Sequence, residues 1–131
     1  MTMAATPQSF NIDAIRRAAI VALTLGTASI HAGLGGTLFT LNAVGYVVGA
    51  TAMIAPLEIA SRFRWLIRIG LAGYAATTIL AWAVQGPFYP TAYVAKTIEL
   101  TLIALLVIDF VRVDGNPVEA IRRAMGGRLT V

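Results

Sequence analysis

The sequence predicts an all-α integral membrane protein, a four-helix bundle with up-down-up-down order and a short C-terminal amphipathic helix on the membrane surface. Of its 131 residues, 58% are hydrophobic and only 12% are charged, about half the charged share of a typical soluble domain. The apolar residues form long runs instead of one-sided stripes, and a helix of about 20 apolar residues crosses a bilayer. The length indicates a single transmembrane domain, residues 1–131.

The first predicted span covers residues 14–33. Asn11 or Ser9 can cap its helix, and Arg16 and Arg17 mark the membrane edge. A secretory signal peptide is the rival interpretation, because a short basic start precedes an apolar stretch. The polar tail before the arginines is long, and this run is needed as a packing partner for the others, so a retained span is favoured.

The second predicted span covers residues 37–59 and follows a short glycine-rich turn at residues 31–36. Pro56 lies near its end and is expected to kink or terminate the helix, because proline has no N–H to donate. A tight basic turn is expected at residues 61–64.

The third predicted span covers residues 65–84, with Arg68 one turn inside its start. The long arginine side chain is expected to reach back to the headgroups. An uncharged turn at residues 85–90 is rich in residues that stop helices, and the fourth predicted span follows at residues 91–111.

A short surface helix is predicted at residues 117–125. Asn116 is placed as its cap, Pro117 takes the first helical position, and Glu119 lies three residues after the cap. Apolar and basic residues then fall on opposite sides of the helix, and Gly126 and Gly127 are expected to end it. This pattern is typical of a helix that lies on a membrane.

The arginines predict the orientation. With four spans, all nine fall on one side of the membrane, and the opposite turns carry no charge: Arg16, Arg17, Arg62, Arg64, Arg68, Arg112, Arg122, Arg123 and Arg128. Basic residues favour the cytoplasmic side. Both termini are therefore expected in the cytoplasm of a multi-pass protein of the plasma membrane (the inner membrane of a prokaryote). The net charge of +4 reflects this orientation and not binding to nucleic acid.

Charged residues inside the fourth span point to a site. Lys96, the only lysine, and Glu99 lie one turn apart, where they can pair. Charges at such depth are costly and mark functional positions. In the predicted topology most polar residues of the spans share the outer half of the membrane. They form a candidate ligand or partner site: His31, Asn42, Tyr46, Tyr74, Thr77, Thr78, Lys96 and Glu99. In a second interpretation, Lys96 reaches the outer headgroups independently of Glu99.

The inner half of the membrane offers few polar residues. Residues 104–108 are unbroken hydrocarbon, and Thr24 and Thr51 are the clear polar interruptions at comparable depth. Asp109 lies close to the inner edge, with Arg112 one turn away. A continuous ion path needs polar groups across this half, so the outer cluster is expected to be closed on its cytoplasmic side.

Three segments resemble a group of small prokaryotic four-helix membrane proteins. They are Leu38 to Tyr46, which contains Leu-Asn-x-x-Gly, then Tyr74 to Ile79, then Lys96-Thr-Ile-Glu99. Proteins of that group also carry a histidine near the end of helix one, as His31 does here. The resemblance implies the topology and the polar cluster, and no particular activity. Small multidrug transporters carry a membrane-embedded carboxylate in helix one, whereas this chain has none between Asp13 and the outer end of that helix. Fluoride channels carry a glycine-arginine signature that does not occur here.

No enzyme is predicted. The absence of cysteine excludes disulfides, thiolate metal sites and cysteine nucleophiles. A single histidine favours neither a metal site nor a cofactor. We expect a small non-catalytic subunit or assembly partner of a larger membrane complex, or a homo-oligomer within the lipid bilayer. The alternative is a small transporter, or a protein that binds a quinone or lipid in the polar cluster. A third possibility is a quinone-binding component of a membrane oxidoreductase.

Overall fold

The fold is all-α, as predicted. The computed structural model describes residues 11–125, and within this range there are six helices and no strand. The helices are α1 (Ile12–Leu34), α2 (Thr37–Ile54), α3 (Glu58–Arg62), α4 (Arg64–Gln85), α5 (Pro90–Val113) and α6 (Pro117–Ala124). The expected cap Ser9, the glycines expected to end the last helix, and Arg128 lie outside the described residues.

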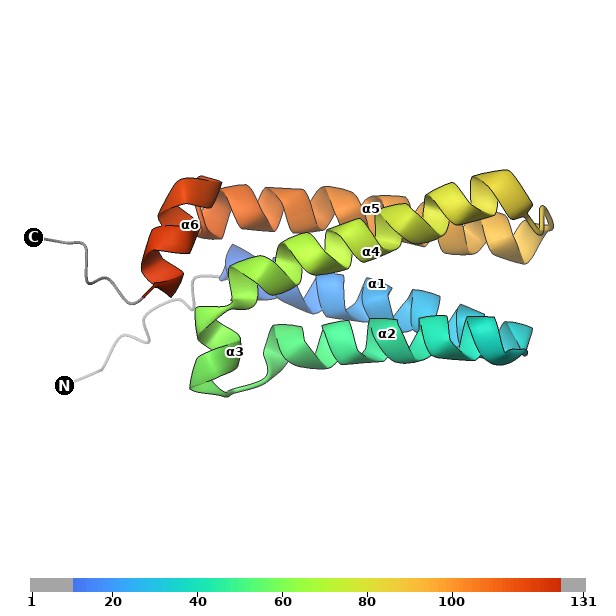
Figure 1. Cartoon of the computed structure of the whole chain (residues 1–131), viewed down its shortest axis with the longest axis horizontal. Coiled ribbons are helices and arrows are strands. Elements are labelled where there is room, and N and C mark those ends of the chain that lie inside the picture. The colour runs from blue at the N-terminus through green and yellow to red at the C-terminus, as the bar shows by residue number, and fades with distance from the viewer. Residues whose placement is uncertain (1–10, 126–131) are drawn as a thin grey trace, which may run out of the picture.

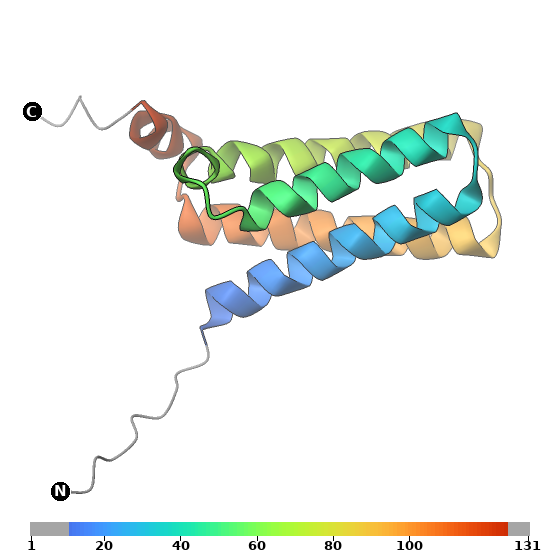
Figure 2. The ribbon, with the colours of Figure 1, turned by 90° about the horizontal axis from the view of Figure 1, so that it is seen from below.

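The four long helices α1, α2, α4 and α5 lie side by side and alternate in direction (Figures 1 and 2). Helix α1 packs against α2 and α5, and α4 packs against α5. Helices α2 and α4 diverge with distance from α3 (Figure 1). We call the end that carries α3, α6 and the start of α1 the α6 end. The opposite end, which carries Gly35 and Pro87, is the Pro87 end.

Side-chain caps fix two helix starts. The Asn11 side chain accepts hydrogen bonds from the backbone N–H groups of Asp13 and Ala14 at 3.1 and 3.3 Å. The Asn116 side chain accepts one from Glu119 at 2.8 Å, as its position before Pro117 predicts. Each cap satisfies N–H groups that have no partner within the helix.

The second long helix is shorter than the predicted span. Helix α2 ends at Ile54, just before Pro56, which was expected to kink or terminate it; residues 55–59 of the predicted span are not part of this helix. Pro56 cannot donate to the helix, and it holds Ala55 in an extended conformation (ψ 126°). The chain then forms α3, which replaces the end of the predicted span and the start of the basic turn expected at 61–64.

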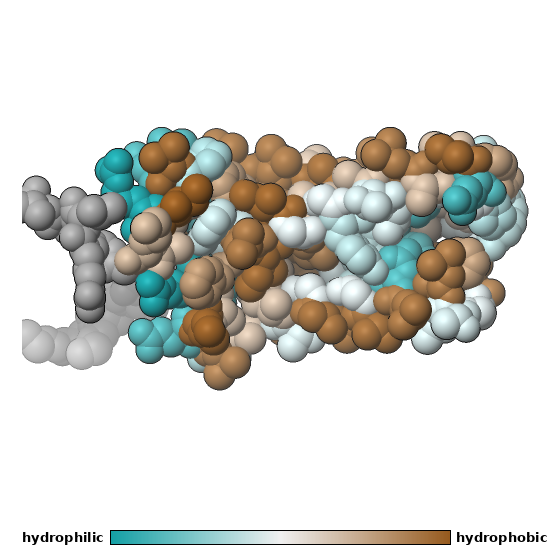
Figure 3. All heavy atoms as spheres, in the orientation of Figure 1, coloured by the Kyte–Doolittle hydropathy of each residue, from teal (hydrophilic) through white to brown (hydrophobic). Residues whose placement is uncertain are grey.

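The interior and the surface are both largely apolar. A core of hydrophobic side chains lies between the long helices and includes Ile20, Tyr46, Met53, Leu71, Ala75, Leu102 and Leu106. Large hydrophobic side chains also cover much of the outside, as the brown areas of Figure 3 show. By length and composition, α1, α2 and α4 can each cross a membrane. Helix α5 is not among these candidates and contains four charged residues, of which Lys96, Glu99 and Asp109 are buried.

Candidate functional site

Glu99 is the centre of the polar cluster and joins three helices. Its carboxylate is fully buried. On one side, Oε2 accepts from Lys96 Nζ at 2.8 Å and from Thr78 Oγ1 at 3.0 Å. On the other, Oε1 accepts from Thr27 Oγ1 at 3.0 Å. Helices α1, α4 and α5 therefore meet at one carboxylate.

Lys96 forms the ion pair expected from its spacing. The side chain is buried, with 7% of the residue exposed, and its ammonium group contacts Glu99. The interpretation in which Lys96 reaches the outer headgroups alone does not agree with this geometry. Helix α5 brings both residues inward because Ala92, Ala95 and Leu102 are buried on the same face.

His31 stands beside the carboxylate without bonding to it. Its Nδ1 lies 2.8 Å from the backbone oxygen of Thr27, and a carbonyl oxygen can only accept, so Nδ1 carries a proton. The other ring nitrogen, Nε2, is 3.7 Å from Glu99 Oε1, beyond hydrogen-bond distance. The ring is 3% exposed and packs against the rings of Phe39 and Tyr46. In the neutral ring Nε2 accepts hydrogen bonds, and in the protonated ring it carries a proton beside Glu99.

A chain of hydroxyl groups leads from Tyr46 to Glu99. The Tyr46 hydroxyl lies 3.1 Å from Thr78 Oγ1, and Thr78 also lies 2.9 Å from the backbone oxygen of Ala75. A threonine has one hydroxyl proton to donate. When the Thr78 proton goes to Glu99, the Tyr46 hydroxyl donates to Thr78. The direction of both hydroxyl hydrogen bonds therefore depends on the carboxylate of Glu99.

Tyr74 explains the glycine in the Leu-Asn-x-x-Gly motif. Its hydroxyl donates to the backbone oxygen of Asn42 at 3.0 Å, and its ring packs edge-on against Tyr46. A Cβ atom at Gly45 would lie 2.3 Å from this hydroxyl. Only glycine leaves room for the tyrosine here, so the motif shapes the contact between α2 and α4.

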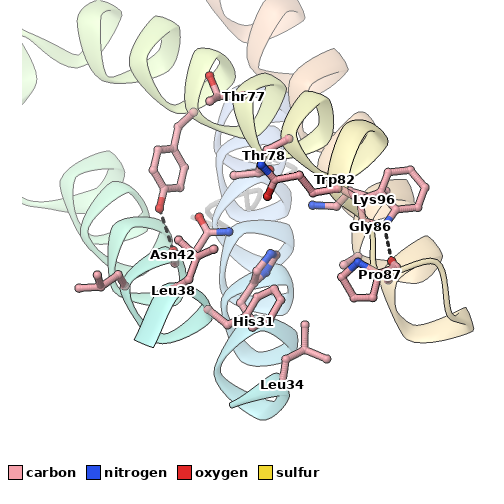
Figure 4. A pocket seen from close by; sticks show the side chains of 17 residues that line it. His31, Leu34, Leu38, Asn42, Thr77, Thr78, Trp82, Gly86, Pro87 and Lys96 are labelled. Carbon is pink, nitrogen blue, oxygen red and sulfur yellow. Dashed lines mark hydrogen bonds between the residues drawn. The ribbon is translucent and has the colours of Figure 1, made fainter. Parts of the chain in front are cut away.

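A cavity of about 350 Å³ opens beside this cluster at the Pro87 end. Figure 4 shows the side chains of His31, Asn42 and Lys96 reaching it from α1, α2 and α5. Figure 3 shows hydrophilic atoms between hydrophobic rims on α2 and α4. The lining residues are His31, Leu34, Leu38, Phe39, Leu41, Asn42, Tyr74, Thr77, Thr78, Ala81, Trp82, Gln85, Gly86, Pro87, Ala92, Ala95 and Lys96.

The predicted site residues divide into those that line the cavity and those behind its wall. Six of the eight line it, and Tyr46 and Glu99 are not among its lining residues. The Thr77 hydroxyl donates to the backbone oxygen of Gly73 at 2.8 Å and takes no part in the Glu99 network. Within residues 11–125, no three potential metal-ligating side chains gather, so the site offers hydrogen bonds and charge.

Sequence reasoning missed two contributors to the site. Thr27, fully buried, binds Glu99 directly; the available signal was its position one helical turn before His31. Trp82 forms part of the cavity wall, and its indole N–H donates to the backbone oxygen of Pro87 at 2.6 Å. Trp82 was not among the predicted site residues.

A second buried charged cluster lies at the α6 end, where few polar groups were expected. Arg68 is 2% exposed; its Nε is 2.5 Å from Asp109 Oδ2, and its NH1 is 2.7 Å from Asp114 Oδ2. Arg16 Nε is 2.7 Å from Asp109 Oδ1. The prediction that Arg68 reaches back to the headgroups was wrong, and Asp109 is paired with these arginines and not with Arg112. The reason is that α1, α4 and α5 turn these side chains towards one another.

Comparisons with protein-family models, with curated proteins and with solved structures found no match to this chain. The function must therefore be argued from the cavity and its side chains.

Proposed function

We propose that the chain is a multi-pass membrane protein that binds a small lipophilic ligand in the cavity at the Pro87 end. In this proposal α1, α2, α4 and α5 cross the membrane as a four-helix bundle. The distribution of side chains supports it, because buried charges and exposed hydrophobic residues are the reverse of a soluble surface. Helix α5 fits as the fourth span because its charged residues Lys96, Glu99 and Asp109 all face inward.

The proposed orientation places the α6 end in the cytoplasm and the cavity on the outer side. It is supported by the arginines of α3 and α6 at one end of the molecule. Helix α6 packs through Ala120 and Ala124 and leaves Val118, Ile121 and Met125 exposed, which suits a helix lying on the bilayer.

Thiol labelling tests this orientation, because the chain has no native cysteine. Single cysteines would replace Ser61, on α3, and Phe88, at the Pro87 end, both exposed positions. An impermeant thiol reagent added to intact cells should label position 88. It should label position 61 only after the membrane is permeabilised. Labelling at position 61 in sealed cells would overturn the orientation.

The cavity is the observation that carries the binding proposal. Its volume of about 350 Å³ falls within the range of ligand sites, which are mostly apolar with a few convergent polar groups. His31, Asn42 and Lys96 are such groups (Figure 4). Since the cavity lies at an end where two helices diverge, a lipophilic molecule can enter without unfolding the chain.

The test is native purification followed by mass spectrometry of small molecules that travel with the protein. Ala81 lines the cavity and Ala83, on the same helix, does not, although both are exposed. We expect Ala81→Phe to fill the cavity and lose the bound molecule, and Ala83→Phe to retain it. Equal retention by both variants would show that the cavity is not the site.

A second candidate is a small non-catalytic subunit or assembly partner, including a homo-oligomer. Exposed glycines on α4 favour it: added Cβ atoms at Gly70 and Gly73 would meet no atom within 4 Å. Such positions allow another helix to approach closely within lipid. If this face binds a partner, Gly70→Leu combined with Gly73→Leu should lower the mass of the native complex without loss of the folded chain. An unchanged mass would rule out this face.

A further inference from the structure

We infer that the cavity at the Pro87 end takes an uncharged amphiphile whose head group presents a hydrogen-bond-accepting oxygen, such as the carbonyl of an ester or ketone, to Lys96. The inference rests on the proposed function and adds the chemical class of the ligand. Unused donors, the charge balance and the apolar wall each support it.

Lys96 and Asn42 bring N–H donors to the cavity for which the described residues supply no acceptor besides Glu99. A lysine ammonium has three N–H bonds, and Lys96 donates to Glu99 while also lining the cavity. The Asn42 side chain points into the same space and makes no hydrogen bond with a side chain or backbone group of residues 11–125 (Figure 4). These donors face the open cavity, and a ligand that displaced water from them without offering an acceptor would leave them unsatisfied, which is costly. A ligand oxygen between Lys96 and Asn42 would satisfy both.

The charge balance selects among acceptor groups. Lys96 and Glu99 form an ion pair of zero net charge. Among the residues that line the cavity, Lys96 is the only lysine or arginine, and Glu99 lies behind the wall. The other ionisable neighbours are His31, whose Nδ1 proton goes to a backbone oxygen, and Tyr46 and Tyr74, whose hydroxyls bond within the protein. A carboxylate head would add an unpaired negative charge, and an ammonium head would face Lys96. Both are unfavourable in apolar surroundings.

The wall defines the rest of the ligand. Leu34, Leu38 and Leu41 form one side, and Ala81, Ala92 and Ala95 form part of the other. These side chains offer only hydrocarbon contact, which suits an aliphatic or ring-shaped body. Because α2 and α4 diverge beside the cavity (Figure 1), a longer tail can leave between them towards lipid. An uncharged oxygen-bearing head with a hydrocarbon body matches both parts.

Trp82 provides a direct signal because it lines the cavity and the chain has one other tryptophan, Trp65. The Trp65→Phe variant in lipid nanodiscs makes Trp82 the only tryptophan, whose fluorescence can be excited selectively over that of tyrosine. Three probes of equal chain length, each brominated on the chain, would be titrated: a methyl ester, the ionised acid and a primary amine. We expect saturable quenching by the ester at a concentration roughly tenfold or more below that needed by the acid or amine.

Matched variants separate binding from partition into lipid. In the Trp65→Phe background, Ala81→Phe should abolish saturable quenching by the ester, and Ala83→Phe should retain it. The Lys96→Met/Glu99→Gln double variant removes the ammonium donors without leaving a charge unpaired, so the ester should bind roughly tenfold more weakly. Should that variant fail to fold, Asn42→Leu tests the second donor, and unchanged ester binding there would count against the inference.

The outcomes distinguish this inference from the proposed function. If the acid or the amine quenches saturably at lower concentration than the ester, the head-group inference is overturned and the binding cavity stands. If none of the three probes quenches saturably, the cavity does not bind amphiphiles, and both proposals fail.

Discussion

Separating Lys96 from Glu99 should produce an asymmetric loss of stability. Lys96→Met leaves a fully buried carboxylate with hydroxyl donors but no counter-charge, at a cost of about 3–5 kcal/mol in free energy of unfolding. Glu99→Gln leaves the ammonium of Lys96 facing the open cavity, where water can solvate it, so the cost should be about 1–3 kcal/mol. The double variant leaves no orphan charge and should cost about as much as Glu99→Gln alone.

The assay is reversible unfolding in detergent for the wild type, both single variants and the double variant. The coupling energy is the difference between the loss in the double variant and the sum of the single losses. We expect a magnitude of about 3–5 kcal/mol, the cost of Lys96→Met alone. Losses that add to within about 0.5 kcal/mol would refute coupling. A larger loss for Glu99→Gln than for Lys96→Met would refute the role assigned to the cavity in solvating Lys96.

The remaining predictions concern packing, the second charged cluster and the surface helix. Gly45→Ala places a Cβ 2.3 Å from the Tyr74 hydroxyl and should lower the free energy of unfolding by about 1–3 kcal/mol. Gly26→Ala, with open space around it, should be neutral or stabilising. Equal effects of the two variants would contradict the close contact between Gly45 and Tyr74. Asp109→Asn breaks ion pairs to two buried arginines and should lower the free energy of unfolding by about 3–5 kcal/mol. Arg112 is exposed, so Arg112→Gln should be near neutral and serves as the control. Both variants are measured by unfolding in detergent. A peptide of residues 114–131 should become helical on anionic vesicles by circular dichroism, and no gain in helicity would count against a surface helix.

Helix positions and the polar cluster around Glu99 could be predicted from the sequence because they follow from local rules. Long apolar runs and the cap at Asn116 place the helices, and the spacing of Lys96 and Glu99 places both on one face. Proline at position 56 was recognised as a disruption, but the sequence does not show whether the chain kinks or stops. The structure shows that α2 stops and α3 begins after a short extended segment.

The cluster at the α6 end could not be placed by depth alone. Arg68 and Asp109 were each assigned to the membrane edge, where a long side chain normally reaches water. Their pairing depends on the rotation of α4 against α5, which single-helix reasoning does not give. A signal was nevertheless present, since Glu99, Leu102, Leu106 and Asp109 follow the three- and four-residue spacing of one inward face. Extending the buried face of α5 from Glu99 by this spacing would have predicted that Asp109 points into the bundle.

The apolar core between the two charged clusters has an electrical consequence in the proposed membrane setting. Ile20, Met53, Leu102 and Leu106 fill the interior between Glu99 and Asp109, which are about 15 Å apart along α5 at 1.5 Å per residue. A charge crossing a membrane held at 100 mV exchanges about 2.3 kcal/mol with the field. If the proposed function holds, this hydrocarbon layer separates the two clusters, and a ligand can bind from one side while the voltage across the membrane is preserved.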